Sequence, residues 1–225
     1  MLENIKIVEP MNIEKSSFDI ITKELDNMGL KYYSDNKYKE LELNIIKRVI
    51  HTTADFDYFN NIYISNNAIE SALNVLKSKC SIFTDTTMAM SGINKRILSS
   101  LNCNIKCFIS DEYVISESRR RNLTRSALAV EKASKDKDIK IYVVGNAPTA
   151  LIAIFEAIKN GYIKNPALII GVPVGFVNVV ESKELFINND MNIPCIIARG
   201  RKGGSNVAAA ILNAILYTIS EDRRE

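Results

Sequence analysis

The chain has a single histidine, His51, and imidazole is the side chain best suited to proton transfer near neutral pH. Arg48 precedes it by three residues, which is one helical turn, so both side chains can project from the same face. A guanidinium can bind a carboxylate bidentately while the imidazole exchanges a proton with a basic atom of the same ligand. The pair therefore suggests acid–base chemistry on an anionic molecule. The alternatives are a structural histidine at a helix end and an arginine on a solvated face.

Two loops in the second half of the chain have the composition of anion-binding turns. Residues 145–149, Gly-Asn-Ala-Pro-Thr, separate an apolar run from a helical pattern, and Pro148 suits the first turn of that helix. Residues 199–205, Arg-Gly-Arg-Lys-Gly-Gly-Ser, are basic, and Ser205 can cap the last helix. Open backbone amides in both loops predict anion binding. Neither loop has the P-loop or GxGxxG pattern, so a nucleotide is not favoured.

An N-terminal helical segment and a parallel sheet must position these residues. Helical periodicity predicts one helix between Asn12 as N-cap and Gly29 as stop, a second that ends near His51, and a third over residues 66–77. Beyond residue 80, short apolar runs alternate with helical patterns, which is typical of a parallel sheet with crossover helices. The predicted strands are residues 80–83, 105–109, 139–144, 167–172 and 195–198, before a closing helix over 205–219.

We therefore expect an α/β fold, with one domain over residues 1–225 and a mainly parallel sheet of about five strands flanked by helices. With 225 residues and 47% hydrophobic content, the chain can bury a single core. Seven of nine glycines and four of five prolines follow Val144, so the tight strand-to-helix connections lie there. Ligands of open parallel sheets gather at such connections.

Composition also excludes several classes of partner. The net charge of +3 is too small for a broad nucleic-acid surface, and the arginines near residues 119–125 lack interleaved aromatic residues. The uncharged stretch 166–180 is interrupted by glycine and proline and is shorter than a membrane span, so no membrane partner is expected. The N-terminus has no apolar signal segment, which predicts a cytoplasmic location. Four scattered cysteines predict free thiols and no metal site.

Three motifs in the second half occur in an order typical of one known family. They are residues 145–151, residues 171–177 followed by Glu181-Ser182-Lys183, and residues 200–205. Weaker matches are residues 13–18, residues 48–57 and the spacing of Asp85, Met88, Gly92 and Ile93. Together these segments span most of the chain and resemble the precorrin-8X methylmutase family, including its anaerobic form that acts on cobalt-precorrin-8. The chain departs from the family at Asn178 and Asn206 and in a charged insertion at residues 134–140.

The resemblance implies a cofactor-free isomerase of cobalamin (vitamin B12) biosynthesis that moves a methyl group from carbon 11 to carbon 12 of a corrin precursor. It implies a homodimer with the pocket near the subunit boundary, and precorrin-8X or cobalt-precorrin-8 and the corrin product as ligands. His51 matches the family's catalytic histidine, which would protonate a ring nitrogen and so make the conjugated system electron-poor.

The resemblance also implies substrate contacts. Ser17, Arg48 and Arg125 match the family's substrate-binding positions, and Asn146 and Ser205 are further candidates. For Ser17 the alternative is a local hydrogen bond within its helix, and for Arg125 the alternative is that it only supports its own helix.

Two rival functions remain open on the sequence. One is a corrinoid-binding protein that sequesters the product without effective catalysis, against which the presence of His51 argues. The other is an unrelated α/β enzyme that uses residues 199–205 to bind a phosphate.

Overall fold

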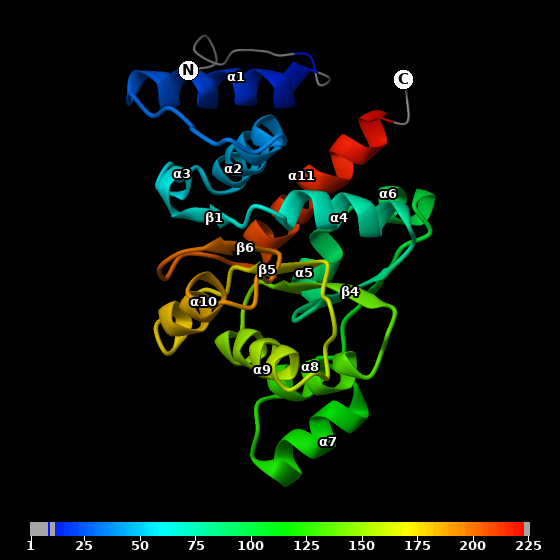
Figure 1. Cartoon of the computed structure of the whole chain (residues 1–225). Helices are drawn as coiled ribbons and strands as arrows, with labels where there is room; N and C mark the ends of the chain where they lie inside the picture. Colours follow the sequence, from blue (N-terminus) through cyan, green and yellow to red (C-terminus); the bar gives the residue numbers. More distant parts are fainter. Residues whose placement is uncertain (1–8, 10–11, 223–225) are drawn as a thin grey trace, which may run out of the picture.

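A six-stranded sheet forms the centre of the computed structural model, which describes residue 9 and residues 12–222 (Figure 1). The strand order is β1-β6-β5-β4-β2-β3; five strands run parallel, and β1 pairs antiparallel with β6 at one edge. The strands are β1 (Ile62–Ile64), β2 (Ser81–Thr84), β3 (Asn104–Lys106), β4 (Ile139–Val144), β5 (Leu168–Gly171) and β6 (Cys195–Ala198). The α/β fold with a mainly parallel sheet is confirmed, with six strands in place of about five.

Strand β1 is the one that sequence periodicity missed. It has three residues, all partly buried, which is too short for an alternating pattern to stand out. The segment is extended because it pairs with β6, where Ile62 lies opposite Ala198 and Ile64 opposite Ile196. The sheet therefore gains an edge strand from a segment that its own sequence does not mark.

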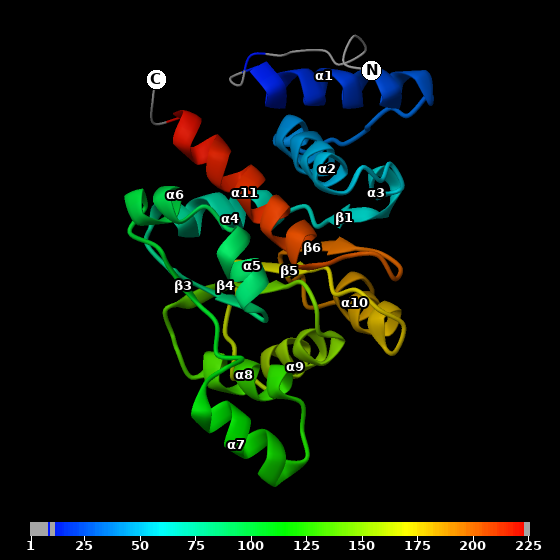
Figure 2. The ribbon, with the colours of Figure 1, turned by 180° about the vertical axis from the view of Figure 1, so that it is seen from behind.

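Helices cover both faces of the sheet, because alternate strand residues point to opposite sides. Ile141 and Val143 of β4 join one core with α2, α4 and α11, and Tyr142 and Val144 join a second core with α8 and α9. Figures 1 and 2 show α1 lying across the outer side of α2. The helices are α1 (Ile13–Asn27), α2 (Lys39–Thr53), α3 (Tyr58–Asn61), α4 (Ala68–Lys77), α5 (Thr87–Gly92), α6 (Lys95–Ser100), α7 (Glu112–Arg121), α8 (Arg125–Ser134), α9 (Pro148–Lys159), α10 (Val179–Ile187) and α11 (Ser205–Asp222).

Two predicted helix caps differ from the structure. Asn12 precedes α1 as expected, but its side chain donates to Glu9 Oε2 at 3.3 Å and makes no cap bond to the helix. Ser205 is itself the first residue of α11, and its hydroxyl is 2.8 Å from the hydroxyl of Thr86. Pro148 does occupy the first turn of α9. Within residues 12–222, no helix is long and apolar enough to cross a membrane.

Candidate functional site

The C-terminal end of α2 presents His51 to α1. The apolar stripe of α2, including Ile46 and Ile50, is buried against the core and leaves positions 48 and 51 on another face. The His51 ring is exposed and tilted against Phe18 of α1, with 5.7 Å between ring centroids. The helix then ends at Ala54 in a left-handed conformation. The predicted helix-end position of His51 is therefore what the structure shows.

Arg48 is fixed on the same side of α2 by three contacts. Its guanidinium lies 2.6 Å from Glu14 Oε1, and its centre lies 5.1 Å from the ring centroid of Phe18 and 4.6 Å from that of Tyr217. The side chain is only 17% exposed. Its Nε is buried and has no hydrogen-bond partner among the described residues. Phe18 thus contacts both Arg48 and His51, and Arg48 retains an unused buried donor.

Ser17 lies beside this group on α1, where its hydroxyl donates to the carbonyl oxygen of Ile13 at 2.9 Å. That is the local hydrogen bond expected for a serine within a helix. We name Ser17, Phe18, Arg48 and His51 the helical cluster.

The loop after β4 is occupied by a carboxylate of the chain itself. Asp85, directly after β2, accepts backbone N–H bonds from Gly145, Asn146 and Ala147, each at 2.9 Å. Asp85 is fully buried, and burial raises the pKa of its carboxyl although the three hydrogen bonds act in the opposite direction. The predicted anion site at residues 145–149 is therefore wrong for these three amides, because Asp85 already takes them.

The loop that follows β6 is held by a buried ammonium group. Lys183 of α10 is fully buried, and its Nζ donates to the carbonyl oxygens of Gly200 at 2.7 Å and Lys202 at 2.8 Å. Burial lowers the pKa of Lys183 to about 8. At Gly203 a Cβ atom would lie 2.1 Å from the carbonyl oxygen of Val172, so this close approach requires glycine.

Lys202 connects this loop to the segment that follows α2. Its ammonium group lies 2.6 Å from Asp55 Oδ2 and 2.7 Å from Asp57 Oδ2, and the hydrogen bond from Lys202 lowers the pKa of the Asp55 carboxyl. Asp55 is four residues beyond His51. The loop held by Lys183 is therefore tied to the helix end that carries His51.

The remaining predicted site residues lie around the C-terminal ends of the strands. A Cβ atom on Gly145 would lie 2.7 Å from Ser205 Cα, so the loop with exposed Asn146 packs closely on the start of α11. Arg125 is exposed at the first position of α8. Thr124, just before it, donates to the Thr149 hydroxyl at 2.9 Å, which places the starts of α8 and α9 side by side. Asn146, Ser205 and Arg125 thus lie together at the C-terminal ends of the strands. We call these three residues the strand-edge cluster.

Large apolar side chains are exposed at these same strand ends, in one loop and in α5. On the loop between β5 and α10, Phe176 is 82% exposed and Val177 is 78% exposed, and Met88 of α5 is 71% exposed. The guanidinium of Arg201 lies 5.6 Å from the ring centroid of Phe176. Neighbouring apolar and basic groups suit a ligand that has a flat body and acidic substituents.

Comparison with known proteins decides the family. The precorrin-8X methylmutase family model matches residues 12–218, which include both clusters. The chain belongs to the precorrin-8X methylmutase family. It is 44% identical to the cobalt-precorrin-8 methylmutase of Salmonella typhimurium, over 96% of this chain and 98% of that protein. It is 36% identical to the precorrin-8X methylmutase of Pseudomonas aeruginosa, over 75% of this chain and 80% of that protein.

A solved structure supports the same placement. The precorrin-8X methylmutase of Thermus thermophilus superposes with a TM-score of 0.81 at 33% identity, covering 94% of this chain and 98% of that chain. Membership of this methylmutase family makes the protein an isomerase, and the resemblance stated from the motifs is confirmed.

Sequence reasoning on this methylmutase-family chain missed the residues that hold the loops. Asp85 and Lys183 entered it only as parts of motifs, and Lys202 only as a basic loop residue. One signal was available, because a lone acid after a buried strand and a lysine within an apolar helical stretch are unusual in the interior of a protein. Their partners lie 60 and 17 to 19 residues away and could not be read from local spacing.

Proposed function

We propose that the protein moves a methyl group from carbon 11 to carbon 12 of precorrin-8X or cobalt-precorrin-8, in cobalamin biosynthesis. In this proposal His51 protonates a nitrogen of the ring next to the migrating group. The conjugated system then becomes electron-poor, which lowers the barrier to migration. The observation that carries the proposal is the exposed imidazole beside Arg48 and Phe18, in a chain that matches the methylmutase family over residues 12–218.

The position of His51 suits an acid. The side chain lies in the last turn of α2, at the end of the helix. It is open to solvent and to a ligand, while Phe18 supports one side of its ring. No cofactor enters this mechanism, since a proton from the protein suffices to start the rearrangement.

Basic and donor groups around the clusters suit the acetate and propionate groups of such a substrate. Arg125 is exposed and forms no ion pair with any described residue, so it is available to a carboxylate. The Nε of Arg48 has no partner among the described residues, but it is buried and Glu14 takes another nitrogen of the same group, so a carboxylate reaches Arg48 only if its side chain moves. Ser17, Asn146 and Ser205 are weaker contacts in this proposal, because Ser17 and Ser205 already make hydrogen bonds within the chain.

We also propose that the protein acts as a homodimer in the cytoplasm. The exposed side chains of Met88, Phe176 and Val177 support the dimer, because a second subunit over these strand ends would cover them together with a flat ligand. Sedimentation of the purified protein tests this part: we expect the mass of two chains, and a fully active species with the mass of one chain would refute it.

The first experiment is a visible-absorption titration with hydrogenobyrinic acid, the metal-free corrin product. Saturable binding with a shifted spectrum is expected, since the product keeps the carboxylates and the flat body of the substrate. Absence of binding to this corrin and to its cobalt form would reject the proposal and favour a phosphate ligand of residues 199–205.

Replacing His51 separates catalysis from binding. His51→Ala should fold, bind the product as before and lose turnover by about 100-fold or more, the lower range for a general acid. Thr52→Ala is the matched control, because Thr52 is the exposed next residue of the same helix end. Wild-type protein that binds the product but never turns over the substrate would instead identify a sequestering protein.

A further inference from the structure

A cavity of about 960 Å³ opens at the N-terminal ends of the strands, opposite the strand-edge cluster. Its wall is made by the end of α8, the start of β4 and the loop before β5, and Ile139, Tyr162 and Ile163 supply apolar surface. Strand β4 begins here and ends at the loop that Asp85 holds, so about 20 Å of strand separates the two places. The volume is at the upper end of the range for small-molecule sites.

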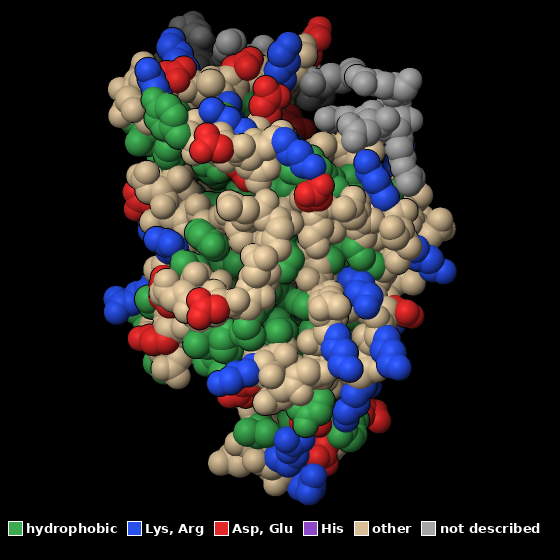
Figure 3. Space-filling view, viewed as in Figure 1, with side chains coloured by type: hydrophobic (Ala, Val, Ile, Leu, Met, Phe, Trp, Pro, Cys, Tyr) green, Lys and Arg blue, Asp and Glu red, His purple; other side chains and the backbone are tan. Residues whose placement is uncertain are grey.

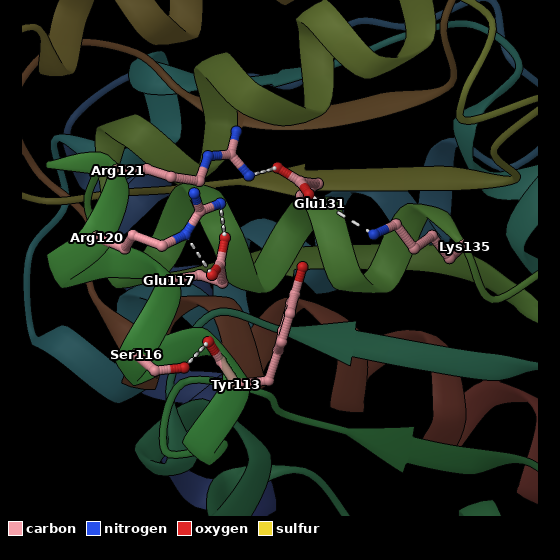
Figure 4. Close-up of polar contacts among 7 residues, drawn as sticks. All are labelled: Tyr113, Ser116, Glu117, Arg120, Arg121, Glu131 and Lys135. Atoms are coloured by element: carbon pink, nitrogen blue, oxygen red, sulfur yellow. Dashed lines mark hydrogen bonds and ion pairs between the residues drawn. The ribbon is translucent and has the colours of Figure 1, made fainter.

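The two acidic side chains of the cavity wall are already neutralised. Figure 4 shows Glu131 between Arg121 and Lys135. Its carboxylate oxygens lie 2.6 Å from Arg121 Nη1 and 3.6 Å from Lys135 Nζ. Asp136 is paired with Lys106 at 2.6 Å, which lowers the pKa of the Asp136 carboxyl. Neither acid is therefore available to the other cations of the wall.

Three further lysines of the wall have no such partner. Lys137, Lys140 and Lys164 line the cavity and form no side-chain ion pair or hydrogen bond with the residues that the structure describes. Figure 3 shows Lys and Arg side chains gathered over the part of the surface where Figure 1 places α8 and β4. The cavity is thus basic, and no side chain of the described residues pairs with these three lysines.

A tyrosine hydroxyl adds a directional donor. Tyr142 lines the cavity, is only 2% exposed, and its hydroxyl makes no hydrogen bond with any described residue. Burial and then the charge of Asp136 raise the pKa of this phenol, so it stays protonated at neutral pH.

We propose that this cavity binds a small anion that carries a flat apolar group, such as an aromatic carboxylate or phosphate. The anionic oxygens contact Lys140 and Lys164 and accept from the Tyr142 hydroxyl, while the ring packs on Ile139 and Ile163. This ligand site is separate from the candidate active site, because it lies at the opposite ends of the parallel strands.

The test is a fluorescence titration of the full chain with 8-anilinonaphthalene-1-sulfonate, which joins aromatic rings to one anionic group. Lys140→Glu with Lys164→Glu should weaken binding ten-fold or more, because two charge-assisted contacts become repulsive. Lys23→Glu with Lys31→Glu is the matched control: it changes net charge equally at two exposed lysines of the N-terminal segment and should bind as wild type does.

Tyr142→Phe keeps the ring and removes only the hydroxyl, so it tests the site without altering charge. We expect binding to weaken roughly two- to ten-fold. The neutral analogue N-phenyl-1-naphthylamine should bind more weakly than the sulfonate to the wild type and be insensitive to the lysine changes. Any of three results would overturn the proposal. The sulfonate could bind both double variants with equal affinity, or the wild type could bind the neutral probe as tightly as the sulfonate. The third result is complete displacement of the sulfonate by hydrogenobyrinic acid.

Discussion

Replacing Lys183 by methionine should remove a specific pH dependence of stability. The pKa of Lys183 is lowered from 10.5 to about 8 in the folded chain, because burial disfavours the ammonium form. Between these two values the unfolded chain binds more protons than the folded one, so the free energy of unfolding rises with pH. Linkage over the window from pH 7 to 9.5 gives a rise of about 2 kcal/mol from this residue alone.

Methionine is the chosen replacement because it is unbranched, of similar length and unable to ionise. At pH 7 it relieves the cost of burying a charge but leaves the carbonyls of Gly200 and Lys202 without a donor, about 1 to 3 kcal/mol each. These effects oppose each other, so the pH slope is a sharper test than stability at one pH.

The assay is urea unfolding of wild type and Lys183→Met, followed by circular dichroism at several pH values from 7 to 9.5. Other groups titrate in this window; burial raises the pKa of Cys195 to about 12, which acts in the opposite direction. Subtracting the free energy of unfolding of one protein from that of the other cancels the contribution of Cys195. The difference should change by about 2 kcal/mol across the window. Lys159→Met, at an exposed lysine of α9, should keep the wild-type slope, and an equal slope in Lys183→Met would refute the reasoning.

Three more substitutions, one of them with a control, test the loops and the ligand contact. Asp85→Asn should lower the free energy of unfolding by about 1.5 to 3 kcal/mol, since an amide cannot accept all three N–H bonds as well as a carboxylate; an unchanged urea midpoint would contradict this. Gly203→Ala should cost about 1 to 3 kcal/mol and reduce turnover, because the new Cβ meets the Val172 carbonyl. Gly161→Ala, strained only by its φ of +74°, should cost about 1 kcal/mol and leave turnover unchanged. Arg125→Ala should weaken corrin binding roughly ten-fold or more, measured by absorption titration, with stability unaltered.

Much of the fold could be predicted from local sequence, and the reasons differ between elements. Strands β4 and β6 were predicted to the residue, because buried parallel strands are largely apolar runs, and only Lys140 interrupts the run in β4. Helices α1 and α2 were recovered from their periodic apolar stripes. Strand β1 was missed because pairing with β6 creates it.

The site was predictable to a different extent. The resemblance and the helical spacing together pointed to Arg48 and His51, and the structure places both beside Phe18. The anion site at residues 145–149 failed because the composition of a loop cannot show that Asp85, 60 residues earlier, fills it. Ser205 failed as a cap for the same reason, since its hydroxyl meets Thr86, 119 residues away. Local sequence patterns do not show polar partners that lie far apart along the chain.

These long-range contacts also explain how an exposed ion pair can help to fix the helix end that carries His51. A surface ion pair by itself contributes little, commonly about 0.2 to 1 kcal/mol, largely because ordering two long side chains costs entropy. Lys202 is 44% exposed, but the backbone that carries it is already held by the buried ammonium of Lys183. Its contacts with Asp55 and Asp57 therefore need less additional ordering than those of a lysine on a free loop. The buried cation of Lys183 thus helps to hold the segment that begins four residues beyond His51. Substitutions at Lys183 should therefore affect the site even though Lys183 does not contact the substrate.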